Sequence, residues 1–474
     1  MSILRSPLRW FLCVALSTAV PATAADRPNF VIFVADDMAW DDCGAYGHPH
    51  IRTPQMDRLA QEGMRFDRAY LTCSSCSPSR CSILTGRYPH STGAAELHLP
   101  LPAEQVLFLS ALRQGGYYTA AVGKWHLGGP AKGQVDLVRE GGGPGGEGDW
   151  VPTLKARPKD HPFCFWFAAT DPHRDYRPGA LVPPHAVDDV VVPPVFPDTP
   201  EVRGDLALYY DEIGRFDAAI GAVRSELDRQ GVLDQTLLLV ISDNGRPFPR
   251  CKTTVYEDGV RTPFLVRYPP LVQPGQTTRG LVSVIDIAPT LLDLAGMELL
   301  PSLQGKSFRA QLSDPDHATR DYAFSEHNWH DYRAFERSVT DGRYRLVRNW
   351  LTHLPTTPPA DAVRSPTYSV MQQRHAAGKL DAPQELVFAA PRAKLELYDI
   401  RADPHCLTNL ADDAAHAAIR RRLQDTLDAW QQETDDKFPG ENRLTPDGFD
   451  RSTGEKVPGM RRPHPGLSKQ ASQE

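Results

Sequence analysis

The stretch NFVIFVADD, residues 29–37, joins a run of apolar residues directly to a pair of aspartates. After Asn29 the run is continuously apolar and rich in branched and aromatic side chains, which favours a short strand buried on both faces. In open α/β sheets, ligands bind beyond the carboxyl ends of such strands. The stretch therefore predicts a parallel sheet with Asp36 and Asp37 at its functional edge.

Three further runs have the same character, YYTAAVG (117–123), PFCFWFAAT (162–170) and TLLLVIS (236–242). Helical patterns separate them. One is TPQMDRLAQEG (53–63), with Thr53 as the N-cap and Pro54 in the first helical position. Another spans 204–230, where apolar residues recur every three or four positions, namely Leu206, Tyr209, Ile213, Phe216, Ile220, Val223 and Leu227. Strands that alternate with helices predict an α/β domain, a mainly parallel sheet flanked by helices.

The pattern changes after about residue 330. RSVTDGRYRLVRN (337–349) and KLELYDI (394–400) predict antiparallel strands, and AAIRRRLQDTLDAWQQE (417–433) predicts an amphipathic helix. The Pro- and Thr-rich segment HLPTTPPADAVRSP (353–366) predicts a loop. We therefore expect a large α/β domain over 26–330, a smaller C-terminal α+β subdomain over 331–456, and a disordered tail over 457–474.

The N-terminus has the features of a secretory signal peptide. Arg5 and Arg9 precede the short apolar stretch 10–20, and Ala22-Thr23-Ala24 supplies an A-x-A cleavage site. The apolar stretch is too short for a membrane span, and no later stretch qualifies. Residues 1–25 are predicted to be a signal peptide, and the protein is predicted to be exported, either periplasmic or secreted.

Composition narrows the class of partner. The 474-residue chain is 41% hydrophobic, enough for a sizeable core, and its formal net charge is −7. A general nucleic-acid binder would show a basic excess or basic runs, so no nucleic-acid partner is expected. An anionic substrate would need positive charge concentrated at one place in the fold.

Polar side chains follow the other predicted strands as well. Lys124 and His126 follow the second run, Asp171 and His173 the third, and Asp243 and Asn244 the fourth, with Lys252 shortly after. Any single one of these residues could be an ordinary turn or cap. Their recurrence at equivalent strand ends predicts a shared site.

The ligand types at these strand ends suggest the chemistry. Asp36, Asp37, Asp243 and Asn244 offer oxygen ligands, which suit Ca²⁺ or Mg²⁺ better than zinc. Lys124, Lys252 and Arg80 supply cations for an oxyanion. His126 and His173 add acid–base capacity near neutral pH.

The segment LTCSSCSPSRCSILTG (71–86) carries three cysteines, Cys73, Cys76 and Cys81. Cys73 and Cys76 have the C-x-x-C spacing of a redox pair. A four-cysteine zinc site needs two such pairs, and the chain has one. Removal of the signal peptide leaves seven cysteines of eight, so at least one is unpaired.

These residues together resemble the type I, formylglycine-dependent sulfatases of the alkaline phosphatase-like superfamily. CSPSR (76–80) with Thr85-Gly86 matches the family signature C-x-P-S-R-x4-T-G. Further matches extend along nearly the whole mature chain: ADDMAWDDCGAYG (35–47), GKWHLG (123–128), TDPHRDY (170–176), ISDNG (241–245), KTTVYEDGVRTPF (252–264) and LYDIRADPHCLTNL (397–410). Asp258 and Cys406 depart from residues common in the family, outside the expected chemistry.

The resemblance implies a nucleophile and a metal. A maturation enzyme would oxidise Cys76 to formylglycine, whose hydrate attacks sulfur. Ca²⁺, with Mg²⁺ the less favoured ion, would be bound by a set of five residues. These are Asp36, Asp37, Cys76, Asp243 and Asn244.

The resemblance also implies roles around the substrate. Arg80 and Lys124 would hold the hydrate. Lys124, Lys252 and His173 would bind the sulfate, with His173 or Lys252 protonating the leaving atom. His126 would take a proton from the second hydroxyl so that sulfate leaves and the aldehyde re-forms. This is covalent catalysis in two steps.

Within the family, SSCSPSR, TDPHR, DNGRPFPR, RYRLVRN and LDAWQQETDD resemble the sulfamidase (N-sulfoglucosamine sulfohydrolase) branch. His98 falls where that branch has a histidine, so it is a candidate sugar contact or an ordinary loop residue. Lys252 stands where sulfamidases are expected to carry arginine. The resemblance thus implies a sulfatase acting on an N- or O-sulfated saccharide. A phosphodiesterase or phosphonate hydrolase of the same superfamily, and a thiol-redox or binding protein, are the alternatives.

Overall fold

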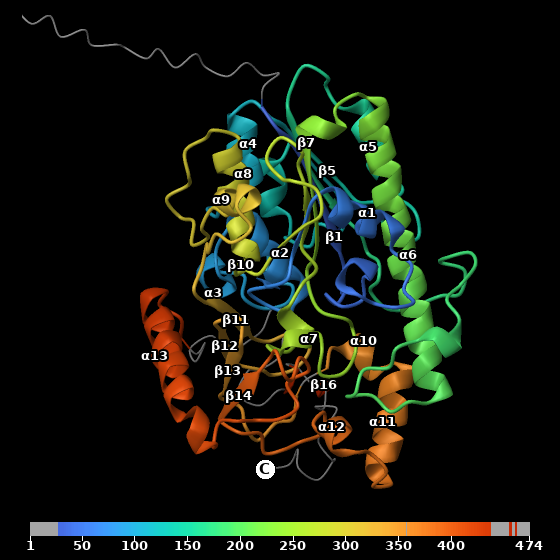
Figure 1. The fold of residues 1–474 in the computed structure, drawn as a ribbon, viewed down its shortest axis with the longest axis vertical. Coiled ribbons are helices and arrows are strands. Elements are labelled where there is room, and N and C mark those ends of the chain that lie inside the picture. Colours follow the sequence, from blue (N-terminus) through green and yellow to red (C-terminus); the bar gives the residue numbers. More distant parts are fainter. Residues whose placement is uncertain (1–26, 357, 438–454, 457–459, 462–474) are drawn as a thin grey trace, which may run out of the picture.

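The computed structural model describes residues 27–356, 358–437, 455–456 and 460–461. The predicted signal peptide lies outside the described residues, as does the predicted tail apart from residues 460 and 461. The described part of the chain is built around a central eight-stranded sheet in the order β5-β4-β6-β1-β7-β8-β2-β9. A four-stranded sheet, β11-β12-β13-β14, lies below it in Figure 1.

The central sheet is mainly parallel. Its strands are β5 (Leu137–Arg139), β4 (Tyr118–Gly123), β6 (Phe163–Ala168), β1 (Asn29–Ala35), β7 (Thr236–Ser242), β8 (Leu265–Arg267), β2 (Met64–Phe66) and β9 (Gln276–Thr278). The neighbours from β5 to β7 all pair in parallel. Strand β8 runs antiparallel to both β7 and β2. The four predicted strands and the α/β class are confirmed.

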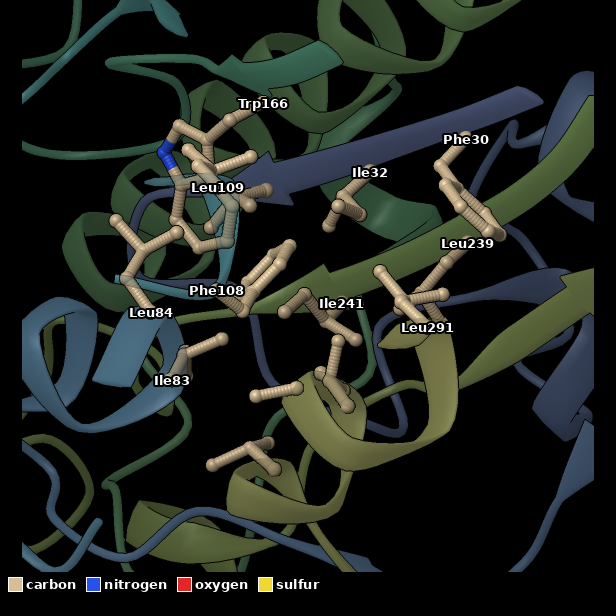
Figure 2. Packing of buried hydrophobic residues seen from close by; sticks show 14 of the residues in the cluster. Phe30, Ile32, Ile83, Leu84, Phe108, Leu109, Trp166, Leu239, Ile241 and Leu291 are labelled. Atoms are coloured by element: carbon tan, nitrogen blue, oxygen red, sulfur yellow. The ribbon is translucent and has the colours of Figure 1, made fainter. Parts of the chain in front are cut away.

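Alternation along β1 explains the layers on either side of the sheet. Phe30, Ile32 and Val34 belong to one buried cluster, while Val31 and Phe33 belong to another. Helices α2 (Cys76–Thr85), α4 (Phe108–Gln114) and α8 (Ile287–Leu294) cover the first face, and Figure 2 shows their side chains meeting those of the sheet. Helices α1 (Pro54–Glu62), α5 (Trp150–Ala156) and α6 (Pro200–Arg229) cover the second (Figure 1).

Helix α6 contains the predicted amphipathic segment, and all seven of its predicted apolar residues are buried. It also supports the start of α1. Thr53 occupies the N-cap position of α1 and Pro54 its first position, as predicted, although the Thr53 hydroxyl makes no cap hydrogen bond. The buried Asp217 carboxylate of α6 instead accepts from the backbone N–H groups of Gln55 and Met56, at 2.8 Å in the shortest bond.

The C-terminal sheet confirms the predicted antiparallel strands. It consists of β11 (Ala323–His327), β12 (Glu336–Thr340), β13 (Tyr344–Asn349) and β14 (Leu395–Asp399), all paired antiparallel. The predicted helix is α13 (Ala417–Glu433), and its Leu423, Leu427 and Trp430 pack on this sheet. Strand β11 begins before residue 330, so the sheet reaches back beyond the predicted domain boundary.

The segment 353–366 is not entirely a loop, and this changes the site. It contains the short helix α10 (Ala360–Val363), followed by α11 (Pro366–Ala376). The composition predicted a loop, but the Asp331 carboxylate accepts from the Ala360 N–H at 2.6 Å and supports the first turn of α10.

The remaining elements are short. Strand β3 (Ala69–Tyr70) pairs with β10 (Val282–Ser283), and β15 (Glu455–Lys456) pairs with β16 (Met460–Arg461). The other α-helices are α3 (Pro89–Thr92), α7 (Glu257–Val260), α9 (Arg309–Ser313) and α12 (Ala382–Glu385). The 3₁₀ turns are η2 (Gly44–Tyr46), η3 (Pro130–Gln134), η4 (Val187–Asp189), η5 (Leu233–Gln235), η6 (Val284–Asp286) and η7 (Ala414–His416). Of the helices in the described part of the chain, none has both the length and the apolar character that crossing a membrane requires.

Candidate active site

The carboxyl ends of β1, β4, β6 and β7 converge at one edge of the sheet. Backbone hydrogen bonds hold the residues that follow them in register. Asp36 N donates to Asp171 O at 2.8 Å, and Asp243 N donates to Ala35 O at 3.1 Å. Lys124 N donates to the carbonyl of Ala168, at the end of β6, at 2.9 Å. The predicted strand-end residues are therefore brought together.

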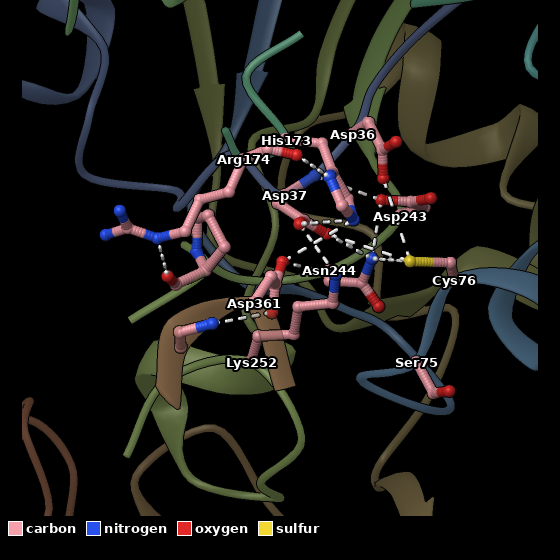
Figure 3. Close-up of polar contacts among 12 residues, drawn as sticks. Asp36, Asp37, Ser75, Cys76, His173, Arg174, Asp243, Asn244, Lys252 and Asp361 are labelled. Atoms are coloured by element: carbon pink, nitrogen blue, oxygen red, sulfur yellow. Dashed lines mark hydrogen bonds and ion pairs between the residues drawn. The ribbon is translucent and has the colours of Figure 1, made fainter. Parts of the chain in front are cut away.

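Three carboxylates at this edge each have a cation as their nearest partner, and Asp36 has a second one, Arg80 Nη2, at 3.8 Å. Lys252 Nζ donates to Asp37 Oδ2 at 2.6 Å, and Arg80 Nε donates to Asp243 Oδ2 at 2.7 Å. Lys124 Nζ contacts Asp36 Oδ2 in the same way. The three carboxylates are fully buried, and Figure 3 shows them together with Lys252. Three negative and three positive charges therefore lie close together in the interior.

Burial and the neighbouring charges shift the pKa values of these three acids. Burial raises the pKa of Asp37 to about 7, although Lys252 opposes the shift, and the Asp36 charge adds to it. Burial likewise raises the pKa of Asp243 to about 6 against the effect of Arg80. Burial would also raise the pKa of Asp36, but Lys124 and the other nearby cations outweigh it and hold that pKa well below its usual range. At Asp37 and Asp243 the cations present thus do not offset the cost of burying a charged carboxylate.

The residues fit a divalent cation. Ligand atoms of Asp36, Asp37 and Cys76 all lie within 4.8 Å of one another. The buried Oδ1 of Asn244 has no hydrogen-bond partner, while its Nδ2 donates to Asp37 and Asp243. Carboxylate and amide oxygens are the donors that hard cations take, and a positive ion would relieve the repulsion among the acids.

Cys76 begins α2 and faces this group. Its Sγ lies 3.5 Å from Asn244 Nδ2 and 3.7 Å from Asp36 Oδ1. Burial raises the pKa of the Cys76 thiol to about 12, although Lys124 and Lys252 oppose the shift. An unmodified thiol here would stay protonated near neutral pH and react poorly as a nucleophile.

The neighbouring cysteines do not form a redox centre with Cys76. The seven cysteines of the described residues are all unpaired and buried. Burial raises the pKa of the Cys73 thiol well above its ordinary value, and that of Cys81 to about 12. A thiol–disulfide pair needs an accessible thiolate, so the geometry disfavours the redox alternative.

The two predicted catalytic histidines line different cavities, each of which also includes Lys124. His173 Nδ1 contacts the carbonyl oxygen of Arg174 at 2.5 Å, and its Nε2 lies 3.8 Å from Asp37 Oδ2. Burial and the nearby Lys252 lower the pKa of His173. Burial and Lys124 lower the pKa of His126 to about 2, so this imidazole is neutral.

His98 is next to His126, with ring centroids 5.2 Å apart, and its side chain lies at the surface. His126 and His98 both adopt left-handed backbone conformations, with φ of 58° and 66°. Asp37 does too, with φ of 77°. Such conformations are costly for residues other than glycine and cluster at functional sites.

Asp361 is a site residue that the sequence patterns missed. It lies on α10, and its Oδ2 is 3.5 Å from His173 Nε2 and 4.0 Å from Lys252 Nζ (Figure 3). This buried oxygen has no hydrogen-bond partner in the described part of the chain. Burial opposes ionisation, yet Lys252 and His173 outweigh it and lower the pKa of Asp361. Its only signal in the sequence is that it is the sole acid in 353–366.

A second missed contact supports the residue before Cys76. Ser75 Oγ and His330 Nδ1 are 2.7 Å apart, and both side chains are buried. His330 lies between β11 and β12 and Ser75 just before α2, so this bond joins the smaller sheet to the start of α2.

Two cavities open beside Lys124. One, of about 540 Å³, is lined by Asp36, Lys124 and His173, and by the cations Arg174, Arg177 and Arg215. The other, of about 550 Å³, adjoins Lys124 and His126. Acids also line both cavities, Asp171, Asp175 and Glu212 in the first and Glu140 in the second, so Lys124 is the cation that the two cavities share.

Comparison with known proteins identifies the family. The Sulfatase family profile matches residues 28–140 and 149–297. The chain belongs to the sulfatase family. A second profile, N-sulphoglucosamine sulphohydrolase C-terminal, matches residues 250–354 of this sulfatase. The central sheet and its strand-end site therefore lie in the part of the chain that carries the family pattern.

Relatives of this sulfatase act on sulfated compounds. Human N-sulphoglucosamine sulphohydrolase is 32% identical over 90% of this chain and 94% of its own. An ulvan-active sulfatase of Formosa agariphila is 29% identical, over 85% of this chain and 75% of its own. N-acetylglucosamine-6-O-sulfatase of Bacteroides thetaiotaomicron is 24% identical, over 88% of both.

Solved structures confirm the fold. One, described as bound to its substrate D-glucosamine-2-N,6-O-disulfate, has a TM-score of 0.68 at 21% identity, covering 88% of this chain and 100% of its own. The chain is thus a hydrolase of sulfuric esters or sulfamates. The comparisons support this activity and not the phosphodiesterase or phosphonate hydrolase alternative.

Proposed function

We propose that this sulfatase removes N-sulfate groups from glucosamine-containing saccharides, using a formylglycine formed from Cys76 and a bound Ca²⁺. The observation that carries the N-sulfate assignment is the position of the Asp361 carboxylate, beside His173 and Lys252. The C-terminal profile match and the human relative support the same substrate.

A carboxylate is an unexpected neighbour for a sulfate, because the two anions repel each other. It suits a substrate that presents a hydrogen-bond donor next to the sulfur. The bridging nitrogen of a sulfamate carries such an N–H, and the departing amine becomes positively charged when protonated. The bridging oxygen of a sulfate ester carries no hydrogen. Asp361 therefore favours an N-sulfate over an O-sulfate.

The surroundings of Cys76 suit an oxygen nucleophile better than a thiol. Formylglycine, when present, supplies a hydrated aldehyde that attacks sulfur and later releases sulfate by re-forming the aldehyde. Arg80 Nη2 is buried without a hydrogen-bond acceptor in the described residues, and an oxygen on residue 76 would provide one. Lys124 and Arg80 would then orient that oxygen.

The metal ligands we propose are Asp36, Asp37, Asp243, Asn244 and residue 76. A bound Ca²⁺ would polarise the sulfate oxygens and the nucleophile. Carboxylates that held the metal would have that ion as their counter-charge in place of Lys124 and Lys252, which now pair with Asp36 and Asp37. Their ammonium groups, together with His173, are then available to bind the sulfate oxygens.

Proton transfer falls to the two histidines. His173 Nδ1 contacts the Arg174 carbonyl oxygen, so the proton that His173 gives to the leaving nitrogen is the one on Nε2. Asp361, 3.5 Å from Nε2, stabilises the imidazolium before the transfer and the new ammonium after it. Lys252, at the same side of the pocket, is the second candidate acid. His126 takes the proton at residue 76, and the neighbouring His98 contacts the sugar.

We propose that the protein is processed in two ways before it becomes an active sulfatase. Residues 1–25 direct export to the periplasm or the outside of the cell, and a formylglycine-generating enzyme oxidises Cys76. The CSPSR sequence (76–80) supports recognition by that enzyme.

A substrate panel tests the function. The matured protein is assayed with N-sulfoglucosamine, glucosamine 6-O-sulfate and 4-nitrophenyl sulfate, and kcat/KM is compared. We expect the highest value for N-sulfoglucosamine. A higher value for glucosamine 6-O-sulfate would overturn the N-sulfate assignment, and no sulfate release from any substrate would overturn the activity itself.

A further inference from the structure

A separate cavity of about 370 Å³ lies at the seam between the two sheets, and arginines dominate its lining. The side chains come from the loop after β1, from 67–70, from 261 and 279, and from the turns after β12 and β14. The lining residues are Trp40, Asp67, Arg68, Tyr70, Arg261, Arg279, Gly342, Ile400, Arg401 and Pro404. None of them belongs to the site described above.

Arg68 lines the cavity without a carboxylate partner among the described residues. Its side chain is half-buried against Gly342. Burial lowers the pKa of Arg68, and the positive charges of Arg401, Arg279 and Arg261 lower it further. Burying a cation without a counter-charge is costly, so this position calls for an anion that the described residues do not supply.

The acids near the cavity already have other partners. Asp67 Oδ1 accepts from Arg65 Nε at 2.9 Å, and Arg279 Nε is 3.9 Å from the other oxygen. Arg261 lies 3.4 Å from the Trp40 ring centroid and 4.0 Å from Glu257. Among the described residues, no carboxylate therefore balances the positive charges of Arg68 and Arg401.

Two neighbouring arginines, in contrast, do have carboxylate partners. Arg343 Nη2 is 3.1 Å from Asp399 Oδ2, and Arg422 Nη2 is 2.6 Å from Asp341 Oδ2. Both are surface arginines of the smaller subdomain, as Arg401 is, yet each has a carboxylate. They provide matched controls for the unpaired arginines.

We propose that this cavity is a second anion-binding site, which takes a sulfate group of a sulfated saccharide away from the catalytic centre. Guanidinium groups bind tetrahedral oxyanions through paired N–H donors, and several converge here. The assignment to a saccharide rests on the proposed function, because that substrate class brings sulfate groups to the protein. Free inorganic sulfate offers the same chemistry, and the test separates the two sources.

The test uses the full chain carrying Cys76→Ala, so that the probe is not consumed. Binding of a highly sulfated hexasaccharide and of sodium sulfate is measured by calorimetry. The Arg68→Gln/Arg401→Gln pair is compared with the control pair Arg343→Gln/Arg422→Gln, which removes the same charge. Arg401→Gln alone, at an exposed position, is a third variant in case the first fails to fold.

We expect two hexasaccharide sites per chain. The Arg68/Arg401 pair should weaken one of them at least about tenfold, the loss of one good charged contact, and the control pair should not. Equal weakening by both pairs, or by neither, would overturn the proposal. Sodium sulfate binding as tightly as the hexasaccharide would overturn the saccharide assignment.

A kinetic control keeps this result apart from the proposed function. Without Cys76→Ala, the Arg68→Gln/Arg401→Gln protein should hydrolyse 4-nitrophenyl sulfate at the unmodified rate, because the cavity shares no residue with the catalytic site. A lower rate would contradict the separation of the two sites. If neither the parent protein nor any variant releases sulfate, the proposed function is wrong. The binding measurements still test the anion-binding site in that case.

Discussion

Asp361 Oδ2 lies 3.5 Å from His173 Nε2, although the two residues come from different parts of the fold, α10 and the loop after β6. This contact places a negative charge beside the imidazole expected to protonate the leaving group. It also leaves a buried acceptor facing the space beside Lys252. The site is thus asymmetric, with cations for the sulfate and one carboxylate for the group that departs.

Replacing that carboxylate should separate substrates by their leaving atom. Asp361→Asn should lower kcat/KM for N-sulfoglucosamine about 10- to 100-fold, because a charged hydrogen bond contributes roughly 1.5–3 kcal/mol. Turnover of 4-nitrophenyl sulfate should change little, because its leaving atom has no N–H and nitrophenolate departs without needing the proton of His173. Asp381→Asn, at the exposed N-cap of α12, is the matched control. Equal losses of kcat/KM on both substrates would show that Asp361 does not recognise the leaving nitrogen.

Metal binding should be visible without any activity measurement. A ligand that binds only the folded state raises stability, by about 2.7 kcal/mol at a hundred times its Kd. Calcium should therefore raise the unfolding midpoint of chelator-treated protein and restore its turnover, with magnesium less effective. Asp37→Asn should abolish the calcium-dependent rise. A metal-free protein with full activity and an unchanged midpoint would refute the metal assignment.

Cys81 should be dispensable for chemistry. It is buried on α2, within the core cluster on one face of the sheet. Cys81→Ala should reduce the free energy of unfolding by about 1–2 kcal/mol through the lost packing, with little change in kcat. Chemical denaturation and an aryl sulfate assay check the two parts. Loss of turnover in a folded Cys81→Ala protein would mean that Cys76 does not act alone among these cysteines.

A partly buried histidine, His90, should make the free energy of unfolding depend on pH. His90 Nδ1 is 2.5 Å from Glu326 Oε2 and 3.9 Å from Asp436 Oδ1. Burial alone would lower the pKa of His90, but Glu326 and Asp436 outweigh it and raise the pKa. A raised pKa means that the charged histidine stabilises the fold fully below its unfolded pKa, and that this contribution is lost as pH rises through the folded pKa.

His90→Gln should therefore cost the most stability in acid. Against the parent, we expect a loss of about 2 kcal/mol near pH 5, the order of a charged hydrogen bond, and a smaller loss near pH 8. Urea unfolding at both pH values measures it, with His161→Gln, at an exposed site, as control. A loss that is the same at both pH values would rule out the charged form as the source.

The long strands and the residues after them could be predicted from the sequence because the signal is local. A buried run such as 29–35 needs no distant information, and parallel strands bring Asp36 and Asp243 to one edge wherever they occur. The three-residue strands β2, β5, β8 and β9 carry too few residues for such a pattern.

Asp361 could not be found in this way. Its segment is rich in proline and threonine, and its helix α10 depends on Asp331, a residue of the loop between β11 and β12. The approach of α10 to His173 is set by tertiary packing rather than by periodicity. The Ser75–His330 contact has the same origin, since it joins two segments that no motif links.

The most direct test of a formylglycine nucleophile is the mass of the peptide that contains residue 76. This mass is measured on active protein and on protein made without a maturation enzyme. We expect the aldehyde mass in active protein, in proportion to the rate of sulfate release, and the thiol mass in inactive protein. Full sulfate release from protein in which residue 76 is entirely a cysteine thiol would contradict it.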